Sequence, residues 1–165
     1  MRSLAIFLDQ EVKEMVKRSI RFRAIGRIDA FPDYIQAKIR NAEEITQDNS
    51  RLILVLALNY GARQEMVDAV KKFSRSVLEG RADPATLDPE TFAGYFYTAG
   101  LPDPDLLIRT SGEMRLSNFL LWQLSYAELY FPRKYWPDFR RDDLAKAIKV
   151  YQRRERRFGG LNAGK

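Results

Sequence analysis

A polar turn with two arginines and two serines follows a short apolar segment in the C-terminal half of the chain. Leu106, Leu107 and Ile108 have the character of a buried strand. The turn that follows contains Arg109, Thr110, Ser111, Gly112, Glu113, Arg115 and Ser117. Guanidinium groups match phosphate oxygens with paired hydrogen bonds, and hydroxyl groups can complete the shell. Because ligands of open parallel sheets bind at the carboxyl ends of strands, the turn is predicted to bind phosphate.

The same residues have structural interpretations. Arg109 alone could form an ion pair with Glu113 or Asp105. Ser117 could cap a helix predicted over NFLLWQLSYAEL, which is compatible with ligand contact. In that arrangement Arg115 and Ser117 lie at the helix entry, where the helix dipole favours an anion. Two arginines combined with serines within nine residues favour the phosphate interpretation.

Glu128 is a carboxylate among apolar and aromatic neighbours, Tyr126, Leu129, Tyr130 and Phe131. In such surroundings a carboxylate caps backbone groups, pairs with an arginine or holds a cation. The spacing supports these three roles equally.

The composition limits the chemistry that the chain can perform. Its 165 residues suit one domain, and 45% hydrophobic content is enough to bury a core. The absence of cysteine excludes disulfides and thiolate chemistry, and the absence of histidine removes the usual general base at neutral pH. A metal must therefore be held by oxygen ligands, which favours Mg²⁺-like ions.

A net charge of +6 suggests an anionic partner. The excess is concentrated in the polar turn and in RRERRF near the C-terminus, whereas nucleic-acid binding would need basic residues interleaved with exposed aromatics along one face. We therefore expect no nucleic-acid partner. No apolar run approaches the roughly 20 residues that span a bilayer, and the N-terminus becomes charged too soon for a secretory signal, so a cytoplasmic location is expected.

Alternating strand and helix patterns predict the α/β class, with a mostly parallel sheet covered by helices on both faces. Helices are expected over residues 4–17, from Asp33, from about Gln64, after the Asp88 cap and near the C-terminus. The third of these should place Met66, Val70, Phe73 and Val77 inward and stop at Gly80. Strands are expected over residues 20–25, 52–61 and 106–108, the second buried on both faces. The whole chain, 1–165, is predicted to form a single domain.

Several ordered motifs resemble one known family. RTSGEMRLSNFLLWQLSYAELYF followed by WPDF and RRFGG resembles the C-terminal signature of the cis-prenyltransferases, the undecaprenyl diphosphate synthase family. NYGAR at residues 59–63 resembles that family's NYGGR, and the preceding IRFRAIG and NAEEITQDNSRLILVLALNYG resemble its strand, helix and strand. The resemblance extends over residues 12–160.

The resemblance implies condensation of isopentenyl diphosphate, with cis geometry, onto an allylic diphosphate such as farnesyl diphosphate. The product would be a polyprenyl diphosphate lipid carrier, delivered to the membrane by a cytoplasmic enzyme at its inner face. By resemblance, the acceptor diphosphate is bound by Arg109, Arg115, Ser117 and the backbone of Leu116, and Glu128 is linked to Mg²⁺. Arg157 and Gly159, in the basic tail 153–165, match an RxG motif that reaches the partner subunit's site in a homodimer.

The chain departs from the family pattern at its start. The family opens with a strand and a DGNGRWA motif, whose aspartate handles magnesium and the allylic diphosphate, and this motif does not occur here. We therefore expect a domain incomplete at its N-terminus, with no catalytic residue of that kind, an acceptor half-site only and no activity alone. The alternative is a non-catalytic subunit or pseudoenzyme of a cis-prenyltransferase complex. Retention of Arg109, Arg115, Ser117 and Glu128 favours the catalytic lineage.

Overall fold

The computed structural model describes residues 2–154. The chain divides into two compact units, residues 1–100 and 101–165, and each is described by itself. Both units contain parallel strands together with helices, so the predicted α/β class is confirmed. The prediction of one domain stays a prediction.

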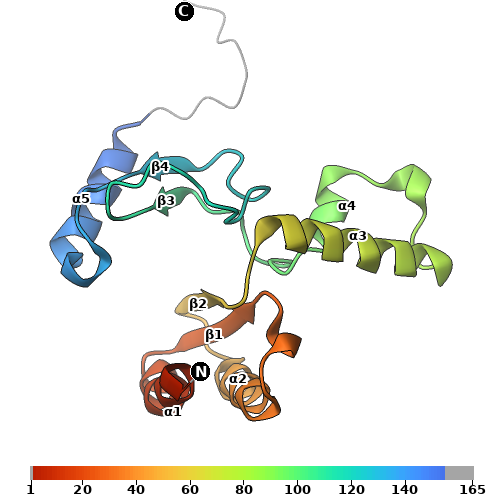
Figure 1. The fold of residues 1–165 in the computed structure, drawn as a ribbon, viewed down its shortest axis with the longest axis horizontal. Coiled ribbons are helices and arrows are strands. Elements are labelled where there is room, and N and C mark those ends of the chain that lie inside the picture. The colour runs from red at the N-terminus through yellow and green to blue at the C-terminus, as the bar shows by residue number, and fades with distance from the viewer. Residues whose placement is uncertain (1, 155–165) are drawn as a thin grey trace, which may run out of the picture. The chain divides into compact units, whose positions relative to one another are not determined.

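The first unit begins with helix α1 (Arg2–Lys17), strand β1 (Ile20–Ile25), helix α2 (Asp33–Thr46) and strand β2 (Leu52–Ala57) (Figure 1). The two strands pair in parallel, with Ile20 opposite Leu52 and Ile25 opposite Ala57. Helices α3 (Ala62–Leu78) and α4 (Pro89–Ala93) follow, with short 3₁₀ turns at Ile28–Ala30 and Pro84–Thr86. These elements begin where the sequence predicts them within a few residues, and the Asp88 side chain caps α4 by accepting the Thr91 N–H at 2.7 Å.

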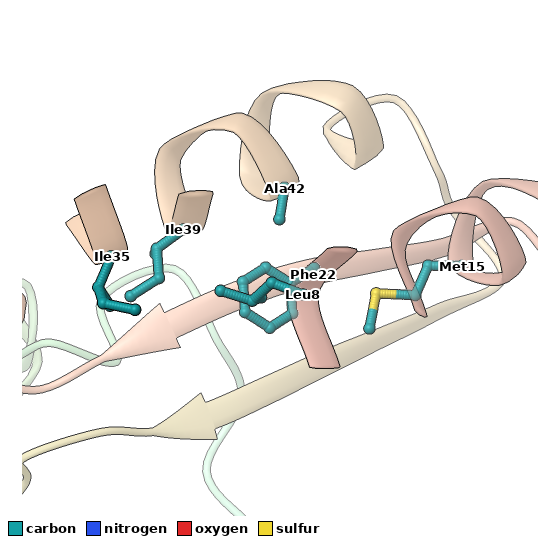
Figure 2. Close-up of a cluster of buried hydrophobic side chains, with 6 residues drawn as sticks. All are labelled: Leu8, Met15, Phe22, Ile35, Ile39 and Ala42. Carbon is teal, nitrogen blue, oxygen red and sulfur yellow. The ribbon is translucent and has the colours of Figure 1, made fainter. Parts of the chain in front are cut away.

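The core of this unit lies between α1, α2 and the strand pair. Figure 2 shows its six side chains, which are Leu8, Met15, Phe22, Ile35, Ile39 and Ala42. The three α2 residues recur at intervals of four and three, so they lie on one helix face, as predicted. Phe22 is 1% exposed, and burial of a side chain of this size contributes about 1.5–3 kcal/mol.

Strand β2 is packed on one face. Leu54 and Leu56 pack against the core cluster, whereas Ile53 on the opposite face is 42% exposed, and Ala57 on that face is exposed too. Leu52, at the start of the strand, is also exposed. Successive side chains of a strand point to opposite faces, so only one of the two sets meets the core. The prediction that this strand is buried on both faces is therefore wrong within the described unit.

The buried face of α3 also differs from the prediction. Its buried residues are Ala62, Glu65, Ala69 and Ser76. Val70 is 51% exposed, and Met66, Phe73 and Val77 are only partly buried. The predicted inward set is wrong because the helix packs through small residues and one hydrogen-bonded carboxylate instead of its larger apolar side chains. Its predicted end is confirmed, since Gly80 has a φ of +69° and the Arg81 N–H donates to the Ser76 carbonyl at 2.8 Å.

The second unit contains strand β3 (Leu106–Ile108), strand β4 (Glu128–Tyr130), a 3₁₀ turn (Trp136–Asp138) and helix α5 (Arg141–Gln152). The two strands pair in parallel, with Leu106 opposite Glu128. The helix predicted over NFLLWQLSYAEL is wrong, because residues 118–127 form turns and the last residues of the segment join β4. Asn118 and Leu120 have φ values of +61° and +44°, which do not belong to a right-handed helix.

No helix among residues 2–154 combines the length and the apolar character that a membrane span requires.

Candidate functional site

The polar turn after β3 is held against the segment that follows β4. The Arg109 N–H donates to the Tyr130 carbonyl at 3.0 Å, which continues the strand pairing by one residue. Ser111 N–H donates to the Lys134 carbonyl at 2.7 Å, and Gly112 N–H donates to the Pro132 carbonyl at 2.8 Å. These bonds fix the start of the turn at the carboxyl end of both strands, where the sequence places the phosphate site.

The Arg109 guanidinium closes this turn into a loop. Its Nη1 donates to the Ser117 Oγ at 2.9 Å and to the Arg115 carbonyl at 2.5 Å. Leu116 lies between these two acceptors, so the structure brings together all four residues predicted to bind the acceptor diphosphate. The alternative ion pair of Arg109 with Glu113 or Asp105 is not formed among the described residues.

Arg115 pairs instead with Glu113, and its side chain is 65% exposed. An exposed ion pair of this kind contributes little to stability, because water screens both charges. A phosphate can therefore recruit the Arg115 guanidinium without a large structural cost.

The loop backbone is unusual at several positions. Ser111, Ser117 and Asn118 have φ values of +71°, +48° and +61°, a left-handed conformation that costs non-glycine residues about 1–2 kcal/mol each. Because no helix begins at Asn118, the predicted helix-dipole contribution to anion binding and the capping role of Ser117 are wrong. Strained backbone of this kind clusters at ligand-binding loops.

Glu128 forms an ion pair with Arg154, one of the three roles that the sequence left open. Its own N–H donates to the Asp105 carbonyl at 2.9 Å. Among residues 2–154 no three acidic side chains gather into a metal site. A lone carboxylate fits a Mg²⁺ ion that takes its remaining ligands from substrate phosphates and water, which is the usual way proteins bind it. Arg157 and Gly159 lie outside the described residues.

A second polar cluster lies in the first unit. The carboxylate of Asp68 on α3 accepts two hydrogen bonds from Arg27, Nε to Oδ2 and Nη2 to Oδ1, both 3.0 Å long. It also accepts bonds from Gln64 Nε2 at 3.1 Å and from the Tyr97 hydroxyl. The Arg27 hydrogen bonds hold the pKa of Asp68 well below its usual range. Burial, followed by the hydrogen bond to Asp68, raises the pKa of Tyr97 to about 12.

The sequence interpretation did not include this cluster. Along α3, Asp68, Lys71, Lys72 and Arg75 follow one another at intervals of three, one and three residues. Asp68 is therefore three or four residues from each lysine, and each lysine is three or four residues from Arg75, which places charged side chains along one face of the helix. That spacing was the available signal. Its partners Arg27 and Tyr97 are distant in the sequence, so no local pattern indicated that they contact Asp68.

Parallel strand pairs together with helices define the class of this protein as α/β, and the polar turn lies at the carboxyl ends of β3 and β4. Comparison with known proteins identifies the family. The family model described as putative undecaprenyl diphosphate synthase matches residues 1–159, so the chain belongs to that family.

Individual relatives are similar to the chain over nearly all of its length. It is 50% identical over 157 residues to isoprenyl transferase 2 of Bradyrhizobium diazoefficiens, which covers 95% of this chain and 62% of that protein. It is 44% identical to the ditrans,polycis-undecaprenyl-diphosphate synthase ((2E,6E)-farnesyl-diphosphate specific) of Micrococcus luteus, over 94% of this chain and 62% of that protein. The chain thus spans about three-fifths of the length of these curated relatives.

A solved structure resembles it closely. Lavandulyl diphosphate synthase from Lavandula x intermedia, in complex with dimethylallyl diphosphate, superposes with a TM-score of 0.92 at 42% identity. The match covers 97% of this chain and 70% of that one. The predicted family is therefore confirmed.

Proposed function

We propose that these 165 residues form the acceptor half-site of a cis-prenyltransferase, which binds the diphosphate of isopentenyl diphosphate. The observation that supports this most directly is the loop closed by Arg109 onto Ser117 and the Arg115 carbonyl. Arg109 sets the loop shape, and the exposed Arg115 and Ser117 supply a charged fork and a hydroxyl to the diphosphate.

In the reaction, a carbon–carbon bond forms between isopentenyl diphosphate and the allylic substrate. The bond between the allylic carbon and its diphosphate oxygen breaks, the diphosphate leaves, and the acceptor loses a proton. The role of Arg115 and Ser117 is to hold the acceptor by its diphosphate end, so that its double bond is presented in one orientation. When bound, Mg²⁺ would neutralise diphosphate charge, and Glu128 is the residue that would hold it once Arg154 releases the carboxylate.

The allylic substrate, for which farnesyl diphosphate is our candidate, requires groups that the 165 residues do not include, because the family's DGNGRWA motif is not among them. We expect this polypeptide alone to bind the acceptor without elongating it. A polyprenyl diphosphate carrier as the product of the whole site, its delivery to the membrane from the cytoplasm, and a homodimer completed by the RxG motif belong to the same proposal.

Calorimetric titration of the 165-residue chain with isopentenyl diphosphate and Mg²⁺ tests the half-site. We expect saturable binding that weakens at least about tenfold in Arg115→Ala, since a charge-assisted bidentate contact is lost. The matched control is Arg141→Ala, which removes an exposed arginine from α5 and should leave the affinity within about twofold.

Absence of binding in the unmutated chain, or equal loss in both variants, would contradict the proposal. A separate incubation with labelled isopentenyl diphosphate and farnesyl diphosphate tests the lack of elongation. Incorporation above a control without protein would show that the 165 residues contain both halves of the site.

A further inference from the structure

A basic cleft in the first unit lies outside the loop described above. It has a volume of about 680 Å³ and lies between the segment 26–30 and α3, with Tyr97 in its wall. Four of its lining side chains are cationic: Arg27, Lys71, Lys72 and Arg75. Two are carboxylates, Asp29 and Asp68, so the lining carries a net charge of +2.

The carboxylate of Asp68 is occupied. Both of its oxygens accept hydrogen bonds from Arg27, and Gln64 and Tyr97 supply two more. This arrangement holds the Arg27 guanidinium in a fixed position, while 42% of its side chain stays exposed. Arg27 is therefore an oriented cation at the cleft, and Asp68 does not repel an anion as a free carboxylate would.

The three α3 cations are arranged differently. Lys71, Lys72 and Arg75 are exposed, and among the described residues none of them has a carboxylate partner. Lys72 Nζ lies 5.1 Å from the centre of the Tyr97 ring, which keeps one ammonium group at the cleft wall. Three cations on one helix face repel each other, and a bound dianion would relieve that repulsion.

We propose that this cleft binds a phosphate-bearing ligand, with Arg27 as the fixed contact and Lys71, Lys72 and Arg75 as adaptable ones. A phosphate group suits the cleft because it offers several oxygens and up to two negative charges to donors that converge from two elements. Two sources present this chemistry, a soluble phosphate compound and a phospholipid headgroup. The inference does not depend on the proposed function.

The test uses the 165-residue chain with Arg115→Ala, so that phosphate binding at the loop after β3 does not contribute. Binding of inorganic phosphate is measured by equilibrium dialysis at constant ionic strength. Vesicles of phosphatidylcholine with and without phosphatidylglycerol test the headgroup. Replacement of Lys71, Lys72 and Arg75 by alanine should weaken whichever binding occurs at least about tenfold.

The matched control replaces Arg141, Lys146 and Lys149 on α5 by alanine. It removes the same types and number of exposed charges, and should change the affinity by less than about twofold. Binding of either ligand that only the α3 variant loses supports the cleft and identifies the source. Equal loss in both variants indicates non-specific attraction to net charge and overturns the proposal.

A measurement without α3 substitutions keeps the proposal falsifiable if the triple variant fails to fold. Acylation rates of lysines are compared by mass spectrometry with and without the ligand that binds. Lys71 and Lys72 should be protected, whereas Lys13 on α1 should react at an unchanged rate. Unprotected Lys71 and Lys72, or absence of binding to both phosphate and vesicles, would overturn it.

Discussion

Arg109 Nη1 donates a hydrogen bond to the Oγ of Ser117, 2.9 Å away. The arginine stands at the end of β3, and the serine lies eight residues later in a loop without regular structure. The same nitrogen also contacts the Arg115 carbonyl, so one guanidinium fixes both residues that we propose to touch the acceptor diphosphate.

Ser117→Ala removes the hydroxyl from this arrangement. We expect the affinity for isopentenyl diphosphate to fall about tenfold, because a ligand hydroxyl and the support of Arg109 are lost together. Ser125→Ala is the control, since Ser125 lies in the same irregular segment and its hydroxyl donates to the Trp122 carbonyl. Calorimetric titration compares the two, and similar affinities would show that the hydroxyl of Ser117 has no part in binding.

Local sequence patterns predicted the strand and the turn that carry this candidate site. The strand at 106–108 and the turn after it were predicted because a short apolar run followed by polar residues and glycine is compatible with few other local structures. The turn indicated Arg109, Arg115 and Ser117 as candidate phosphate ligands, and the resemblance to the family added the backbone of Leu116.

The loop conformation was not predictable in the same way. NFLLWQLSYAEL has helical composition, yet the backbone turns into the left-handed region at Asn118 and Leu120. Propensity describes a residue's preference in isolation, and contacts such as that of Arg109 with Ser117 override it. The Asp68 cluster was missed for a related reason, since its partners Arg27 and Tyr97 meet only in the folded chain.

Thr46→Val tests a buried hydrogen bond between α2 and β1. The Thr46 hydroxyl is fully buried, accepts the Phe22 N–H at 2.9 Å and donates to the Ala42 carbonyl at 2.8 Å. Valine leaves the Phe22 N–H without an acceptor, which should lower the free energy of unfolding by about 1–3 kcal/mol.

Thr46→Ser is its matched control. It keeps the hydroxyl and loses one methyl group, for an expected cost of about 0.8 kcal/mol. Urea denaturation measures both variants. A valine variant as stable as the serine variant would mean that the Phe22 N–H finds another partner.

Gly26→Ala tests the junction of β1 with the chain that leaves β2. Gly26 has a φ of +110°, and an added Cβ would overlap the Leu58 carbonyl oxygen. The Leu58 N–H donates to the Ile25 carbonyl at 2.8 Å, so the two segments cannot separate without breaking the strand pairing. We expect a loss of about 3 kcal/mol in the free energy of unfolding, from steric overlap and the unfavourable φ together.

Gly80→Ala separates these two contributions. Gly80 has a φ of +69°, and an added Cβ would meet no atom within 4 Å. Its cost should be about 1 kcal/mol, from backbone conformation alone. Equal losses for the two glycines in thermal denaturation would show that the contact with Leu58 has no steric effect.

Tyr97→Phe tests the hydrogen bond between Tyr97 and Asp68 through its pH dependence. In the folded chain the pKa of Tyr97 is raised to about 12, first by burial and then by Asp68, whereas an unfolded tyrosine has a pKa of about 10. A raised folded pKa means that the neutral phenol is stabilised by folding. Its contribution is complete below about pH 10 and is lost as the pH rises from about 10 to about 12.

The unmutated chain should therefore lose stability relative to Tyr97→Phe across this window, by up to about 1 kcal/mol per pH unit. Urea denaturation of both chains at intervals between about pH 9 and about pH 12 measures the difference. Tyr135→Phe is the control, because it removes a tyrosine hydroxyl from a side chain that is 66% exposed. Parallel stability curves for the unmutated chain and Tyr97→Phe would mean that folding does not raise the pKa of the phenol, either by burial or through Asp68.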